Sequence, residues 1–140
     1  MTRQVMERPL SRDMRRATVL VVDDDVFCRS LLTRILLQLG VDVAHASDGD
    51  VAPQRVEELR PALVFMDIEM PRESGLSATR RIRSLRSAAS TVPVVGVTAS
   101  AVDESSCLDA GMESLLRKPI SRVTIERSLR AAGVMAAATV

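Results

Sequence analysis

Short apolar runs alternate along the chain with longer stretches in which apolar residues recur at helical spacing. The apolar runs predict strands at positions 19–22, 41–46, 63–66, 92–97 and 114–117. The periodic stretches predict helices at positions 27–39, 48–59, 76–85, 103–110 and 121–132. Strands that alternate with helices pair in parallel through right-handed crossovers. We therefore expect an α/β fold, a doubly wound five-stranded parallel sheet in the order 2-1-3-4-5.

Single residues refine the limits of these helices. Glycines that follow helical stretches are expected to end them at Gly40, Gly111 and Gly133. Pro53 lies inside the second helical stretch, so that helix should begin late or be kinked. Ser121 is expected to cap the last helix. In the first helix, apolar residues recur at helical spacing: Phe27, Leu31, Leu32, Ile35, Leu36 and Leu39. The third helix is expected to have a solvated side with Arg80, Arg81, Arg83 and Arg86.

The composition fits one domain. The length of 140 residues suits a single domain with its own core, and the hydrophobic content of 46% is ordinary. No apolar run reaches the roughly 18 residues of a membrane span. Arginines interrupt the N-terminus, so no signal peptide and no membrane association are expected. The net charge of +1 gives no reason to expect a nucleic-acid partner.

The chain divides into three parts on this pattern. We expect a flexible basic N-terminal arm at 1–17, a compact domain at 18–133 and a short C-terminal tail at 134–140. Cys28 and Cys107 lack the spacing of metal ligands, and free, buried thiols are typical of a reducing compartment. A cytoplasmic location follows as an expectation.

Polar residues that suit phosphate and metal chemistry stand at the ends of four predicted strands. Asp23 and Asp24 follow the first strand, Asp67 the third, Thr98 the fourth and Lys118 the fifth. In an open α/β sheet, the carboxyl ends of the strands converge on one crevice. An acidic run alone is also typical of a turn, but the conjunction at successive strand ends favours a site. We expect an aspartate that becomes phosphorylated beside a divalent metal.

Magnesium is the metal expected at this crevice, because it prefers hard oxygen ligands. Asp24 and Asp67 are candidate direct ligands, and Asp23 is a candidate direct or water-mediated ligand. The backbone carbonyl of Glu69, just past Asp67, is a further candidate.

Donors for an incoming phosphoryl group follow from the same strand ends. The Lys118 ammonium is a compact charge suited to bridging Asp67 and a phosphoryl oxygen. The Thr98 hydroxyl and the backbone N–H of Ala99 are expected to donate to another oxygen. The bond before Pro119 is a candidate cis peptide bond.

Four segments, VLVVDDD, VFMDIEMPRESG, VPVVGVTASA and GMESLLRKPI, closely resemble receiver domains of two-component response regulators. The resemblance covers 18 to about 132 and includes both single-domain regulators and receivers of hybrid kinases. It implies a flavodoxin-like fold with Asp67 as the phosphoacceptor, and Asp23 and Asp24 as the acidic magnesium pair. It also implies Thr98 as the switch hydroxyl and Lys118 as the family's lysine. The implied partners are a histidine kinase or histidine phosphotransfer protein and a downstream protein.

Three features depart from the family pattern. Leu115 stands where the family usually has a switch aromatic residue, three positions before Lys118. The stretch between Thr98 and Gly111 is about two residues shorter than usual, and Pro53 disturbs the second helix. The first two departures fall on the face that receivers commonly use to signal, so the resemblance supports phosphorylation more firmly than the usual output.

Two other functions stay open. A phosphorylation-independent adaptor would use the same fold only as a docking surface. A metal-dependent phosphatase of the haloacid-dehalogenase type is suggested by Asp67 and Glu69, but those enzymes have an aspartate at the second position and a cap domain. With no separate substrate expected, a signalling role and not an enzyme is the leading hypothesis.

Overall fold

Five strands form one parallel sheet in the computed structural model, which describes residues 17–135. They are β2 (Thr18–Val22), β3 (Asp42–Ala46), β4 (Leu63–Asp67), β5 (Val94–Thr98) and β6 (Ser114–Arg117). The order β3-β2-β4-β5-β6 confirms the predicted order 2-1-3-4-5. The expected basic arm, except for its last residue, and most of the expected tail lie outside the described residues.

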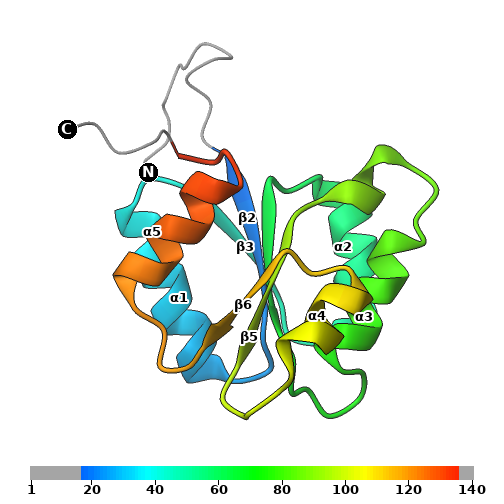
Figure 1. Cartoon of the computed structure of the whole chain (residues 1–140). Coiled ribbons are helices and arrows are strands. Elements are labelled where there is room, and N and C mark those ends of the chain that lie inside the picture. The colour runs from blue at the N-terminus through cyan, green and yellow to red at the C-terminus, as the bar shows by residue number, and fades with distance from the viewer. Residues whose placement is uncertain (1–16, 136–140) are drawn as a thin grey trace.

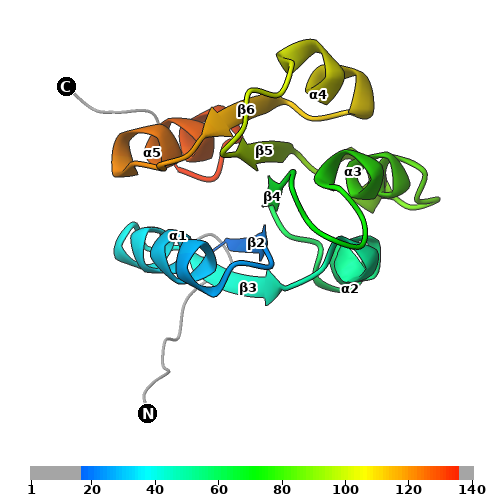
Figure 2. The same cartoon turned by 90° about the horizontal axis from the view of Figure 1, so that it is seen from below.

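Helices cover both faces of the sheet (Figure 1). The helices α1 (Val26–Gln38) and α5 (Arg122–Ala131) lie on one face. The other face is covered by α2 (Ala52–Leu59), α3 (Gly75–Arg83) and α4 (Glu104–Ala110), and the view from below in Figure 2 shows the same two layers. None of these described helices is both long and apolar enough to cross a bilayer.

The two layers of helices enclose two separate cores. Alternate residues of β2 divide between them: Val19 and Val21 pack with residues of α1 and α5, and Leu20 and Val22 pack with residues of α2 and α3. Every residue of β4 and β5 is buried, because central parallel strands are covered on both sides. This explains why the strand signals in the sequence are continuous apolar runs.

Proline sets two of the element boundaries. Pro53 lies in the first turn of α2, which follows the short 3₁₀ helix η2 (Gly49–Val51), so the predicted late start is confirmed. The predicted strand from position 92 begins only at Val94. Pro93 has no N–H for the ladder, and the N–H of Val92 is bonded instead to Ala89 O at 3.2 Å, inside η3 (Ala88–Thr91).

The helix ends follow the predicted signals closely. Gly111 ends α4 with φ of +105°, in the left-handed region that glycine tolerates. Ser121 caps α5, and its hydroxyl accepts the N–H of Thr124 at 3.3 Å. The third helix ends at Arg83, earlier than the predicted position 85. The fourth helix is short, at seven residues, as expected.

The apolar face of α1 is narrower than its spacing indicates. Leu32, Ile35 and Leu36 are buried, but Phe27 is 84% exposed and Leu31 is 42% exposed. Phe27 and Leu31 are four residues apart, so they form a separate stripe beside the buried one. This stripe begins next to the carboxyl ends of the strands.

The expectation that Arg83 lies on a solvated face is wrong. Arg83 is half-buried and donates to three backbone carbonyls. Its Nη1 donates to Ser90 O at 2.8 Å and Val92 O at 2.7 Å, and its Nε and Nη2 donate to Gly111 O at 3.0 and 2.7 Å. Arg80, Arg81 and Arg86 are exposed, as predicted.

Candidate functional site

Three carboxylates meet at the carboxyl ends of β2 and β4. Asp23 and Asp24 directly follow β2, and Asp67 is the last residue of β4. One oxygen from each lies within 4.8 Å of the others. Asp23 and Asp67 are each only 3% exposed, and Asp24 is exposed. The arrangement offers hard oxygen ligands with one side open to solvent, which fits a magnesium ion that keeps several waters.

Backbone N–H groups orient the two buried carboxylates. The N–H of Asp25 donates to Asp23 Oδ1 at 2.9 Å, and the N–H of Glu69 donates to Asp67 Oδ1 at 3.3 Å. The side chain of Asp25 turns away and caps α1, where it accepts the N–H of Phe27 at 3.0 Å. Asp25 therefore has a structural role as a helix cap, and Asp23 and Asp24 are the two aspartates of this run that can bind a metal ion.

Lys118 places a cation between the two buried carboxylates. Its Nζ lies 3.6 Å from Asp23 Oδ2 and 3.7 Å from Asp67 Oδ1. Burial opposes ionisation of this ammonium, but the charges of Asp23 and Asp67 outweigh burial and raise the pKa of Lys118. The backbone N–H of Lys118 donates to Thr98 O at 2.7 Å, and the peptide bond from Lys118 to Pro119 is cis.

The environment of Asp67 disfavours its negative charge. Burial of the carboxyl and the nearby charge of Asp23 raise the pKa of Asp67 to about 7, although Lys118 opposes the shift. A bound divalent cation would reverse this balance, because it favours the ionised form of its ligands.

Close packing fixes the backbone at Asp67. A side chain at Gly75 would collide with the backbone carbonyl oxygen of Asp67 and approach Met66 Cγ to 2.9 Å. The N–H of Gly75 donates to Ile68 O at 3.0 Å, which holds the start of α3 against the end of β4. The glycine in the segment after Asp67 is thus required by this close approach.

The expected phosphoryl donors lie at the same edge of the sheet, but they have another partner. Thr98 ends β5, is fully buried, and donates its hydroxyl to Glu69 Oε2 at 2.5 Å. The N–H of Ala99 donates to Glu69 Oε1 at 3.3 Å. For the receiver function, the sequence predicted a role only for the backbone carbonyl of Glu69. The signal for its side chain was its place two residues past Asp67, beside the end of the neighbouring strand.

Leu115 packs into the core of the fold. It is a half-buried residue of β6 that packs against the core under α2, α3 and α4. A side chain at Gly96 would approach Leu115 Cδ1 to 3.3 Å and Met112 Sδ to 2.6 Å, so the glycine leaves room for both. Leu115 is therefore part of the packed layer between the sheet and these helices.

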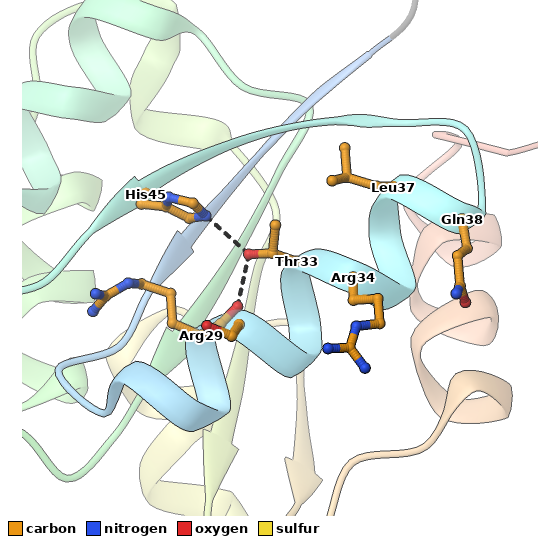
Figure 3. A pocket seen from close by; sticks show the side chains of 7 residues that line it. Arg29, Thr33, Arg34, Leu37, Gln38 and His45 are labelled. Carbon is orange, nitrogen blue, oxygen red and sulfur yellow. Dashed lines mark hydrogen bonds between the residues drawn. The ribbon is translucent and has the colours of Figure 1, made fainter.

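A groove of about 650 Å³ between α1 and β3 lies outside this constellation (Figure 3). None of the described residues that line it is acidic, and Thr33 Oγ1 lies 2.9 Å from His45 Nε2 within it. The side chains of Arg29 and Arg34 extend in different directions in Figure 3, so the described lining residues do not direct their charges to one point.

Comparison with known sequences identifies similar domains. The family model of the response regulator receiver domain matches residues 19–130. The chain is 36% identical over 124 residues to the CAI-1 autoinducer sensor kinase/phosphatase CqsS of Vibrio cholerae, across 87% of this chain and 18% of that protein. It is 39% identical over 113 residues to the sensor histidine kinase RcsC of Escherichia coli, across 79% of this chain and 12% of that protein.

Shorter relatives and solved structures agree. The chain is 36% identical over 121 residues to the DNA-binding response regulator MtrA of Mycobacterium tuberculosis, across 85% of this chain and 51% of that protein. Among solved structures, it resembles the receiver domain of the sensor histidine kinase PA1611 from Pseudomonas aeruginosa, with TM-score 0.77, 32% identity and coverage of 85% and 99% of the two chains. That crystal structure has a magnesium ion coordinated in its active-site cleft.

Proposed function

Because this chain belongs to the response regulator receiver domain family, we propose that it is a phosphorylatable switch of two-component signalling with Asp67 as its phosphoacceptor. The observation that carries the proposal is the buried Asp67 carboxylate, which lies beside two further carboxylates and 3.7 Å from the Lys118 ammonium. A nucleophilic carboxylate, a metal site and a cation are the parts that transfer of a phosphoryl group to aspartate requires.

The chain's own residues divide the work of this transfer. An oxygen of Asp67 forms the new bond to phosphorus while the bond from phosphorus to the donor nitrogen breaks and its electrons stay with the donor. In this proposal Lys118, which lies 3.7 Å from Asp67, holds one phosphoryl oxygen, and the Thr98 hydroxyl and the Ala99 N–H donate to another. Asp23, Asp24, Asp67 and the Glu69 carbonyl would hold Mg²⁺, which neutralises developing charge on the phosphoryl oxygens when bound.

The proposed donor is a histidine kinase or a histidine phosphotransfer protein, and the proposed output is contact with another protein. Two of the relatives are sensor kinases, and the chain spans under a fifth of their length. Val26 and Phe27 are 59% and 84% exposed and directly follow the acidic run. Exposed apolar side chains beside the site fit docking of a protein. No separate substrate is proposed.

The experiment is incubation with acetyl phosphate, with Mg²⁺ or with a chelator, followed by measurement of the phosphorylated fraction. We expect phosphorylation of the wild type with Mg²⁺, and a loss of at least roughly 100-fold in the chelated sample and in Asp67→Asn. The control is Asp109→Asn, which changes an exposed aspartate on α4 and should behave like the wild type. Equal phosphorylation of Asp67→Asn, or of the chelated wild type, would overturn the proposal.

A further inference from the structure

The carboxylate of Glu69 is held by three consecutive residues at the end of β5. Thr98 Oγ1 and Ser100 Oγ lie 2.5 and 2.8 Å from Glu69 Oε2. The N–H of Ala99 lies 3.3 Å from Glu69 Oε1. Both carboxylate oxygens are therefore occupied, and hydrogen bonds to a charged acceptor are among the stronger ones in proteins.

These donors include the ones that the proposed function assigns to the phosphoryl group. A hydroxyl has a single proton to donate, so Thr98 serves either Glu69 or a phosphoryl oxygen. Thr98 is fully buried, so water offers it no ready substitute. Glu69 and a phosphoryl group are thus alternative acceptors for the same donors.

Their negative charges are a second reason why the Glu69 carboxylate and a phosphoryl group cannot occupy the site together. Asp23, Asp24 and Asp67 already gather negative charge at this edge, and Lys118 is the cation paired with two of them. A phosphoryl group that reached Thr98 while Glu69 stayed there would add like charges at short range, which repel.

We propose that, in the resting protein, the Glu69 carboxylate occupies the position that a phosphoryl oxygen takes after phosphorylation. Glu69 must then leave before Thr98 and Ala99 can donate to the phosphoryl group. The proposal rests on the proposed function. Glu69 is then a positioning residue: through Thr98 and Ala99, it sets how readily the site accepts a phosphoryl group and how far the segment 98–100 is ordered before phosphorylation.

The other side of the same segment is tied to β6. Arg117 Nη1 donates to Ser100 O at 2.8 Å, and Arg117 Nη2 donates to Val102 O at 3.0 Å. When Glu69 leaves, this tether remains. Departure of Glu69 therefore frees the Thr98 hydroxyl, the Ala99 N–H and the Ser100 hydroxyl. The backbone of the segment stays bonded to Arg117.

The test compares Glu69→Gln and Glu69→Ala with the wild type and with Glu73→Gln. Glu73 is the matched control. Its carboxylate lies on the same loop but accepts hydrogen bonds from Ser77 and Arg81, and none from Thr98 or Ala99 is observed. The first measurement is amide exchange in the metal-free, unphosphorylated proteins. Exchange at Ala99, whose N–H donates to Glu69, should be about tenfold faster in Glu69→Ala and unchanged in Glu73→Gln.

The second measurement is binding of beryllofluoride with Mg²⁺, a mimic of the phosphoryl group. Both Glu69 variants should bind it about tenfold more tightly than the wild type. Unchanged exchange in Glu69→Ala, or equal beryllofluoride affinity in all the proteins, overturns the inference and leaves the proposed function standing. A wild type that neither binds the mimic nor accepts phosphate overturns both.

Discussion

At the scale of single residues, Asp67 combines burial with like charge. The carboxyl is 3% exposed, and Asp23 lies close enough to share contact with Lys118. Both effects disfavour the ionised form, so the pKa of Asp67 rises from the ordinary 3.8 to about 7. In the absence of metal, the resting fold therefore carries an electrostatic cost at this residue.

That cost gives a pH dependence of stability whose sign is fixed. The folded protein holds the Asp67 proton up to about pH 7, and the unfolded chain loses it near pH 3.8, so the stabilising contribution of the proton is lost as the pH rises between these values. In metal-free buffer, Asp67→Asn should melt several degrees above the wild type at pH 8, and the gap should narrow at pH 5. Thermal melts followed by circular dichroism measure it, with Asp109→Asn as the control. A gap that widens toward pH 5 would contradict the assignment.

At the scale of elements, one side chain joins the end of α3 to segments that are distant in the sequence. Arg83 donates to carbonyls of η3, of the turn before β5 and of the end of α4. Burial lowers the pKa of its guanidinium but leaves it charged at neutral pH. The five donors of a planar guanidinium suit several carbonyls at once, as a single ammonium does not.

Removing that side chain should cost much more stability than removing a neighbouring arginine. We expect Arg83→Ala to lose about 2–4 kcal/mol, because three partly buried carbonyls would lose their donors. Arg86→Ala is the matched control, since Arg86 is exposed, and it should change stability by less than about 0.5 kcal/mol. Urea unfolding at pH 7 measures both. Equal losses in the two variants would show that the Arg83 hydrogen bonds contribute little.

The elements also show which features a sequence can reveal. The strands were predictable because both faces of β4 and β5 are buried, which leaves continuous apolar runs. The contacts of Arg83 with Gly111 and of Thr98 with Glu69 join residues 28 and 29 positions apart. Local patterns carry no record of such pairs. Hence helix ends and strand ends were predicted closely, while the roles of the Arg83 and Glu69 side chains were not.

At the scale of the whole molecule, the strand order gathers the candidate site. β2 and β4 are neighbours, so Asp23 and Asp67 meet, and β5 and β6 bring Thr98 and Lys118 beside them. The topology predicted from alternating strands and helices was therefore sufficient to place these residues together. Topology does not specify side-chain packing. It therefore predicted neither the hydrogen bond from Thr98 to Glu69 nor the exposure of Phe27 and Leu31.

The same architecture would also serve an adaptor that ignores phosphate, and the chemistry of Asp67 separates the two. The most direct measurement is to phosphorylate the wild type with acetyl phosphate and Mg²⁺, reduce the acyl phosphate with borohydride, and locate the modified residue by mass spectrometry of peptides. We expect one modified residue, Asp67, and none when a chelator is present. Modification at Asp23, Asp24 or Glu69 instead, or an unmodified Asp67 under conditions that phosphorylate a known receiver, would contradict it.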